Sequence, residues 1–479
     1  MNKLNRRDFL KTTLLTTASL SLFPALRTSA GPNEEIGVAV VGFHGRGRAH
    51  IDGYSRVKGT RLVALCDVDQ HVMDGELKRC ANRGQEPKSY TDIRKLLENP
   101  DVDIVSIAMP NHWHSLAGVW SIQAGKDVYV EKPVSHEVWE GRQLVKAARN
   151  HNRIVQTGTQ CRSSSGITEA IQWVREGNIG KIIRARGLCY KRRPSIGKVT
   201  HPTPIPEWID YNLWCGPAPE VPLMREHLHY DWHWVWPTGN GDLGNQGIHQ
   251  MDIARWALGE PELSPRVLSV GGRLGYVDDG TTPNTLVVFH DYPAAPLIFE
   301  VRGLPSKAGS NQMDSYRGAR IGVVVDCEGG SMVIPSYDTA VIYDKHQTEI
   351  KRFRGASSHF QNFIDAVRSR RYTDLHADIL QGHISSGLCH TGNISYRLGK
   401  KRPPEEIRDA VNADKDLAEA VGRMEEHLGA NNIDLHKTPA TLGVALRMNP
   451  ETERFIGNRR ANRLLRRHYR KPFVVPAKV

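Results

Sequence analysis

The chain has 479 residues, of which 39% are hydrophobic and 24% are charged, a composition typical of a globular protein of two to three domains with a large core. Its net charge of +12 comes almost entirely from residues 1–30 and from the arginine-rich stretch 459–471, so we expect no nucleic-acid partner. Seven scattered cysteines without a C-x-x-C pair argue against a disulfide scaffold and structural zinc, and we expect no metal site.

The first thirty residues predict an export signal. Arg6 and Arg7 precede an apolar, hydroxyl-rich stretch that ends in small residues, which is typical of a cleavable twin-arginine-type signal peptide. That route carries folded proteins, so a cofactor can be bound in the cytoplasm and leave with its protein. No later apolar run has spanning length, so we expect a periplasmic or extracellular protein without stable membrane insertion.

Residues 33–157 alternate strand-like and helix-like segments and form the first expected domain. The strand-like runs are rich in β-branched residues along their whole length, as strands buried on both faces are. They lie at 36–42, 60–67, 102–109 and 127–131, with helical spacing at 68–82 and 113–125. This alternation predicts a parallel, doubly wound sheet, the Rossmann type of α/β fold.

The turn after the first strand has the spacing of a dinucleotide-binding motif. In GFHGRG the G-x-G-x-x-G positions fall on Gly42, His44 and Gly47, so the side chain of the central histidine must point away from a bound pyrophosphate. The next strand ends at Asp67, whose carboxylate can accept hydrogen bonds from ribose hydroxyls and would repel a 2′-phosphate. We therefore expect NAD rather than NADP, with a tight turn that binds no ligand as the alternative.

Two further segments, PNHWH at 110–114 and EKP at 131–133, follow predicted strands at the edge where ligands bind in open α/β sheets. Burial beside a cationic nicotinamide would lower the pKa of Lys132, which could then exchange a proton with a substrate alcohol. The residues expected to bind the cofactor are Gly42, His44, Gly45, Arg46, Gly47, Asp67, Pro110, Asn111, His114, Glu131 and Lys132.

After residue 157 the pattern changes to alternating, β-rich runs joined by turns. These runs lie at 181–190, 284–291, 297–303, 320–327 and 339–344. They predict an α/β domain over 158–400 with one large, mostly antiparallel open sheet covered on one face. Helical segments near 357–397 could pack back on the Rossmann domain, and 401–479 is expected to form a helical, basic extension.

The motifs VEKPVS, PNHWH and GNQGIHQMDIARW (244–256), after a glycine-rich turn, resemble the Gfo/Idh/MocA oxidoreductases of sugars and polyols over roughly residues 35–400. The resemblance implies a cofactor domain followed by an α/β domain whose sheet covers the active site. It also implies that Lys132 contacts substrate and nicotinamide beside a cis peptide at Pro133.

The same resemblance points to residues of the second domain. It implies a catalytic role for His249, and the aspartate that the family commonly has four residues earlier is replaced here by Asn245. On a helix these two side chains share a face, so His249 would receive the hydroxyl proton while Asn245 orients the sugar. Asp252, Gln160 and Arg162 are expected substrate contacts, with interdomain hydrogen bonding as the alternative for the last two.

The stretch 227–242 is unusually rich in aromatic residues and histidine. On a strand, Trp232 and Trp234 share one face, where they could stack on a sugar ring, with simple packing as the alternative. His229 and His233 would share the other face about 13 Å apart, which is too far for one metal ion to bridge.

These features predict an exported, NAD-dependent oxidoreductase that transfers hydride between a sugar, polyol or glycoside and a tightly held nicotinamide. Outside the cytoplasm the reduced cofactor cannot readily be exchanged, which favours a closed redox cycle. An NAD-dependent glycosidase acting by transient oxidation and elimination is one alternative, although such relatives tend to depart from E-K-P. A non-catalytic sugar-binding subunit is another, and by analogy we expect a homo-oligomer.

Overall fold

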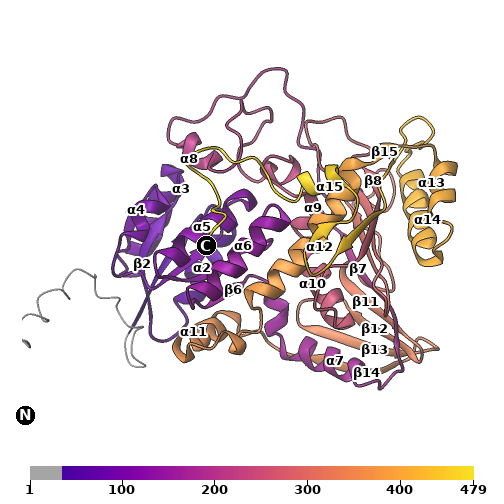
Figure 1. Cartoon of the computed structure of the whole chain (residues 1–479), viewed down its shortest axis with the longest axis horizontal. Helices are drawn as coiled ribbons and strands as arrows, with labels where there is room; N and C mark the ends of the chain where they lie inside the picture. Colours follow the sequence, from indigo (N-terminus) through magenta and orange to yellow (C-terminus); the bar gives the residue numbers. More distant parts are fainter. Residues whose placement is uncertain (1–34) are drawn as a thin grey trace, which may run out of the picture.

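The computed structural model describes residues 35–479, which contain two β-sheets (Figure 1). The expected signal peptide therefore lies outside the described residues. The first sheet has six parallel strands in the order β3-β2-β1-β4-β5-β6, so the expected doubly wound sheet is confirmed. Its strands are β1 (Ile36–Val41), β2 (Thr60–Cys66), β3 (Lys88–Tyr90), β4 (Ile104–Ile107), β5 (Asp127–Val130) and β6 (Val155–Thr157). The three-residue strands β3 and β6 are too short to show a periodicity and were not predicted.

Helices cover both faces of this sheet. They are α2 (Arg46–Tyr54), α3 (Gln70–Ala81), α4 (Ile93–Leu97), α5 (Asn111–Gln123) and α6 (Val138–Asn150). Alternate residues of β1 enter different hydrophobic clusters: Ala39 packs on the side of α5 and α6, and Val40 on the side of α2 and α3. Helix α3 begins two residues later than expected because Asp69 caps it, accepting a hydrogen bond from the amide of Val72.

The second sheet has twelve strands and is mostly antiparallel, which confirms the expected α/β fold class. Its long strands run in the order β14-β13-β12-β11-β7-β10-β9-β8, and the pair β7 and β10 is parallel. They are β7 (Ile182–Tyr190), β8 (Arg266–Gly272), β9 (Thr285–His290), β10 (Leu297–Arg302), β11 (Ile321–Cys327), β12 (Gly330–Ile334), β13 (Thr339–Asp344) and β14 (Glu349–Arg354). The short strands are β15 (Lys400–Lys401), β16 (Thr441–Leu442), β17 (Leu446–Asn449) and β18 (Arg454–Phe455).

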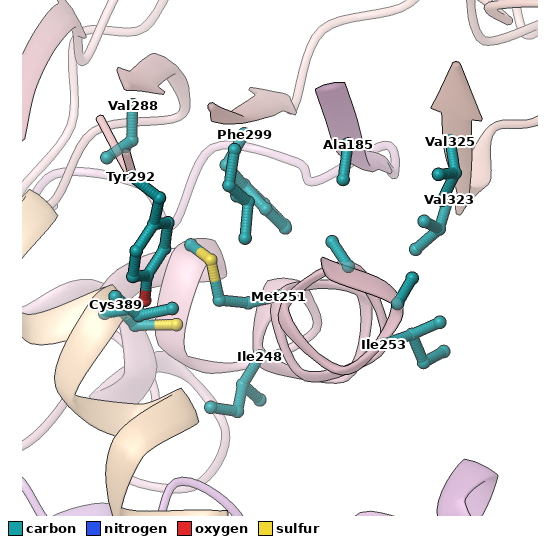
Figure 2. Close-up of a cluster of buried hydrophobic side chains, with 14 of the residues drawn as sticks. Ala185, Ile248, Met251, Ile253, Val288, Tyr292, Phe299, Val323, Val325 and Cys389 are labelled. Carbon is teal, nitrogen blue, oxygen red and sulfur yellow. The ribbon is translucent and has the colours of Figure 1, made fainter. Parts of the chain in front are cut away.

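One face of this sheet packs on helices α7 (Ser165–Arg175), α10 (Gly247–Leu258) and α12 (Ile379–Leu398). Figure 2 shows Ile248, Met251 and Ile253 around α10, between strand residues such as Phe299 and Cys389 on the neighbouring helix. Helix α10 is thus buried on almost every side. That rigid position matters because α10 carries His249.

Two expectations about the second half differ from the structure. The opposite face of the sheet is also covered, at β8 to β10, by α13 (Pro404–Val411) and α14 (Lys415–Ala430). Beyond α14 the extension is not helical as expected, apart from α15 (Arg459–Arg463), because β16 and β17 join the sheet. The last residues instead lie on the Rossmann domain, where Phe473 is buried against Trp113.

Helix α11 (His359–Ser369) packs under the Rossmann sheet through Phe363 and Ile364, and α12 packs on α6. All seven cysteines lie within the described range, where they are buried and unpaired. Over residues 35–479, no helix combines the length and the apolar character needed to cross a membrane.

Candidate active site

A cavity of about 820 Å³ runs along the carboxyl ends of the Rossmann strands and is closed from the other side by the second domain. It is lined by the turn after β1, the ends of β2, β4 and β5, and the start of α5. The second domain contributes Leu213, Trp214, His229, Tyr230, Trp232, His233, Asn245, His249, Tyr337, Ser357, His359 and Phe360.

The turn after β1 has the shape of a dinucleotide cradle. Gly42 has φ +76° and lies so close to the backbone of Met109 that a side chain would collide, and a Cβ on Gly47 would lie 2.1 Å from the carbonyl oxygen of Gly42. Gly45 forms the N-cap of α2 without a side-chain hydrogen bond, and a Cβ there would meet nothing within 4 Å. The open, positively polarised helix end suits a pyrophosphate.

His44, which replaces the middle glycine, lies in the cavity wall. Its partly exposed ring contacts the ring of His229 edge-on, with centroids 4.1 Å apart. Burial, and then the neighbouring His229, lower the pKa of His44. The side chain therefore contacts the second domain, while His44 and its neighbours in the turn line the cavity.

Asp67 directly follows β2, at the edge of the sheet where an adenosine ribose would lie. Its carboxylate accepts hydrogen bonds from the amides of Phe43 and Asp69, at 2.9 and 3.1 Å, and so also fixes the glycine-rich turn. Burial raises the pKa of Asp67 against the effect of these hydrogen bonds. The position fits the expected contact with ribose hydroxyls.

The PNHWH segment starts α5. Pro110 is its N-cap, and the side-chain amide of Asn111 donates to Oδ1 of Asn240, which joins the helix to the second domain. The ring of His114 lies between the carbonyl oxygens of Met109 and Pro133, with each of its nitrogens 2.6 Å from one of them. This histidine therefore lies between the loops after β4 and β5, and because burial lowers its pKa the neutral ring donates to only one of the two carbonyls.

The EKP tripeptide follows β5, and the peptide bond between Lys132 and Pro133 is cis, as the family resemblance implied. The carboxylate of Glu131 accepts hydrogen bonds from Arg46 at 2.9 Å and His50 at 3.1 Å. Burial alone would raise the pKa of Glu131, but the His50 hydrogen bond and the Arg46 charge outweigh it and hold that pKa well below its usual range. Burial also lowers the pKa of Lys132, against the opposing charge of Glu131.

Lys132 and His249 both line the cavity, although they belong to different domains. The ammonium of Lys132 donates to the backbone carbonyl of Asn245 at 2.6 Å. Burial, followed by the charge of Lys132, lowers the pKa of His249 to about 3, and its Nδ1 has no hydrogen-bond partner among residues 35–479. A neutral imidazole is thus available to accept a proton.

Asn245 does not share a helix face with His249 as expected. It follows the short helix α9 (Gly241–Gly244) and precedes α10, with φ −88° and ψ −81°. Asn245 acts on Lys132 mainly through its main-chain oxygen, since its side-chain Oδ1 is 3.5 Å away.

Two expected substrate contacts lie outside the cavity wall. The guanidinium of Arg162, in the short helix η1 (Gln160–Ser163), pairs with the carboxylate of Asp252 through contacts of 2.8 to 3.0 Å, and both are buried. Ser385 adds a hydrogen bond to the same carboxylate at 2.6 Å. With their polar atoms committed to each other, Arg162 and Asp252 fix α10 rather than contact a substrate. Gln160 does line the cavity.

The aromatic stretch is not a strand. Residues Asp231–Trp234 form a 3-10 helix, η2, so the alternate-face arrangement is wrong. Trp232 lines the cavity and stacks on His233 with ring centroids 3.6 Å apart, whereas Trp234 is buried outside the cavity wall and covered by Arg193. Hydrogen bonds from Thr281 and Thr282 to the carbonyl of Trp234 favour the compact form.

Several lining residues were not predicted from the sequence. Trp214, Tyr337, Ser357, His359 and Phe360 reach the cavity from loops and helix ends far apart in the chain. No local motif marks them. Within the described range, no group of three or more histidine, cysteine or acidic residues could hold a metal ion.

Two family models match the chain. Residues 36–159 match the Gfo/Idh/MocA model described as an oxidoreductase family, NAD-binding Rossmann fold, and residues 177–284 match its C-terminal alpha/beta domain. Curated relatives include a glycosyl hydrolase family 109 protein 1 of Shewanella sp. strain MR-4, 28% identical, and an alpha-N-acetylgalactosaminidase of Shewanella oneidensis, 27% identical. Each match extends over 229 residues, 42% of this chain and 50% of the relative. The chain thus spans about half the length of the curated relatives it matches.

Solved structures show the same fold over more of the chain. The WlbA dehydrogenase of Chromobacterium violaceum, in complex with NADH and UDP-GlcNAcA, has a TM-score of 0.59 at 17% identity and covers 78% of this chain and 96% of its own. GenD2 from gentamicin A biosynthesis, in complex with NAD, has a TM-score of 0.53 at 19% identity, with 78% and 97% covered. Both domain models match in chain order on this two-sheet fold, so residues 36–159 are similar to the NAD-binding Rossmann domain of the Gfo/Idh/MocA oxidoreductases and residues 177–284 to their C-terminal alpha/beta domain.

Proposed function

We propose that this protein is an exported NAD-dependent oxidoreductase acting on a hydroxyl-bearing carbon of a sugar, polyol or glycoside. The observation that carries the proposal is the meeting of Lys132 and the neutral His249 in one cavity beside the glycine-rich turn. The twin-arginine pattern of residues 1–30 supports the export.

Lys132 and His249 have different roles in removing the hydroxyl proton. A substrate hydroxyl beside Lys132 would receive a hydrogen bond from Nζ, which stabilises the negative charge that develops on its oxygen. The imidazole of His249 accepts the hydroxyl proton through Nδ1, which has no hydrogen-bond partner among residues 35–479. NAD, when bound, supplies the hydride acceptor.

Residues around this pair position the cofactor and the sugar. Asp67 fits the adenosine ribose and the open end of α2 fits the pyrophosphate, while Glu131 and Arg46 neutralise each other beneath Lys132. Trp232 and Gln160 remain proposed substrate contacts, since both line the cavity. We also keep a homo-oligomer as a proposal, by analogy alone.

A second candidate is an NAD-dependent glycosidase, in which the sugar is oxidised, eliminates its aglycone and is then reduced again. The names of the curated relatives favour it. The intact E-K-P tripeptide, whose lysine lines the same cavity as His249, favours the oxidoreductase. Both reactions use the same proton acceptor and differ in whether a glycosidic bond breaks.

Mass spectrometry of products separates the candidates. The purified protein is incubated with a panel of sugars, polyols and glycosides, with Lys132→Met as the control for background reactions. Oxidised products lighter by two hydrogens support the oxidoreductase, whereas free aglycone with an unoxidised sugar supports the glycosidase. A protein that releases no nucleotide on heat denaturation and turns over nothing would be a binding subunit instead.

A further inference from the structure

A segment of the second domain crosses the adenosine side of the cofactor cavity. We call residues 208–233 the strap; it lies between β7 and α10 in the chain. Its backbone pairs with the residues that follow β2: the amide of Gln70 donates to the carbonyl of Trp208, and the amide of Asp210 to that of Val68, at 3.0 and 3.1 Å. The ring of His229 adds a hydrogen bond to Asp69 at 2.8 Å.

The strap is a packed wall with a small core of its own. Its apolar side chains Ile209, Trp214, Leu223 and Leu228 are buried against one another, with Val68 of the Rossmann domain packed beside them. Leu213, Trp214 and His229 line the cavity; Leu213 packs in one cluster with Ile93, and the strap pairs with Val68, the residue after Asp67. A dinucleotide whose ribose contacts Asp67 would therefore be covered by the strap.

The strap is also fastened to α5, the helix that starts with the PNHWH segment. His112 and Trp113 hydrogen-bond to the strap carbonyls, with His112 Nε2 at 3.0 Å from Trp214 and Trp113 Nε1 at 3.0 Å from Leu213. Gly216 lies against the indole of Trp113, where a Cβ would come within 2.2 Å. A strap lifted off the cavity would have to give up these contacts.

The end of the chain holds the strap from outside. We call residues 464–479 the tail; in Figure 1 it runs in yellow from α15 past α8 (Tyr211–Cys215), the helix of the strap. Arg470 donates to the carbonyls of Asn212 and Gly216, at 2.6 and 3.2 Å, and pairs with Glu220 at 3.0 Å. Phe473 is 1% exposed, packed near Trp113, so the tail is anchored in the Rossmann domain.

We propose that the strap and the tail form a clamp that retains NAD through many turnovers, with Arg470 as the positioning residue that ties them together. This inference rests on the proposed function, because a retained cofactor matters for turnover only if the protein takes hydride from a substrate. Hydride taken from a carbinol carbon must then return to a substrate-derived carbon on the same protein molecule, so electrons balance without an external oxidant. The net reaction is redox-neutral, as a closed cycle requires.

Nucleotide exchange tests the clamp without using activity. Full-length holoprotein is mixed with excess isotope-labelled NAD, desalted at intervals and extracted, and the labelled fraction is measured by mass spectrometry. The variants are Arg470→Gln and Arg470→Lys, with Arg408→Gln as the matched control, because Arg408 pairs with Glu425 on the second domain away from the strap. Melting temperatures are recorded for each.

We expect wild type and Arg408→Gln to exchange over hours, and Arg470→Gln to exchange at least about tenfold faster because charge-assisted hydrogen bonds to the strap are lost. Arg470→Lys keeps the positive charge but loses the planar, multiple-donor guanidinium, so its exchange rate should lie between those of wild type and Arg470→Gln. The clamp is refuted if folded Arg470→Gln exchanges at the wild-type rate, if wild type exchanges within seconds, or if the protein is purified without nucleotide.

The exchange assay contains no sugar, so its result does not depend on whether the proposed function is correct. Slow exchange in a protein that turns over none of the sugars or glycosides leaves the clamp standing and refutes the function. Rapid exchange in a protein that oxidises a sugar refutes the clamp alone.

Discussion

The buried pair between Arg162 and Asp252 gives a prediction that separates structural support from substrate binding. Asp252→Asn removes the only carboxylate that Arg162 contacts in the described chain and leaves the guanidinium buried, with Arg255 also 3.8 Å from the same oxygen. Breaking a buried ion pair in this way costs about 3–5 kcal/mol. For a domain of this size that loss corresponds to a fall in melting temperature of roughly 10 °C.

Differential scanning calorimetry and urea unfolding of wild type and Asp252→Asn measure this loss. The matched control is the double variant Arg162→Met/Asp252→Leu, which replaces the pair by apolar groups of similar volume and should recover part of the stability, because Arg255 and Ser385 still lose their contacts with the carboxylate. If Asp252→Asn has the melting temperature of the wild type and changes only KM, which rises, then the carboxylate contacts substrate and the structural reasoning is wrong.

The remaining predictions concern proton transfer, pH and cofactor choice. Lys132→Met and His249→Gln should each lower kcat/KM by about 10²–10⁴-fold in steady-state assays, with melting temperatures near wild type. Burial lowers the pKa of His290 to about 3, against the smaller opposing effect of the Leu388 backbone. The unfolded chain protonates this histidine near pH 6.5, so its contribution to stability is lost as pH falls, and in urea unfolding His290→Leu should lose roughly 2 kcal/mol less than wild type between pH 7 and pH 5. Asp67→Asn should weaken NAD binding and reduce the preference for NAD over NADP by about tenfold in titrations, because a ribose acceptor and a repelling charge are lost.

Specific results would contradict each of these. A His249→Gln enzyme with full activity removes that residue from proton transfer. Equal pH sensitivity in wild type and His290→Leu means that the imidazole is hydrated or paired in solution. An unchanged NAD preference in Asp67→Asn places the adenosine ribose elsewhere in the cavity.

The sequence predicted the features that depend on local order along the chain. Buried parallel strands are rich in β-branched residues on both faces. A tight turn from a strand into a helix needs glycines, here Gly42 and Gly47. Both signals are visible in a single sequence. The EKP tripeptide after β5 likewise placed Lys132 at the ligand-binding edge. Parallel topology brings all such strand ends to one edge, whatever the loops do.

Tertiary structure decided which of the candidates meet at the cavity. Arg162 and Asp252 have the chemistry of substrate contacts, yet they pair with each other beside α10. An unpaired charge in the protein interior is costly, so each of these buried groups is paired within the protein and not kept free for a ligand. Trp232 and Trp234 alternate like strand residues, but the η2 helix sends one to the cavity and the other into the interior. Alternation alone could not distinguish the two.

The strap and the tail show the same division. Trp214 and Arg470 are separated from the Rossmann strands by long stretches of sequence, and nothing around them forms a motif; their role arises from hydrogen bonds to main-chain carbonyls, which any sequence supplies. The sequence by itself therefore determined the nucleotide turn, the lysine and the two sheets. Only the folded chain decided what covers the cofactor cavity, since that depends on contacts between segments far apart in the chain, and residue spacing does not encode such contacts.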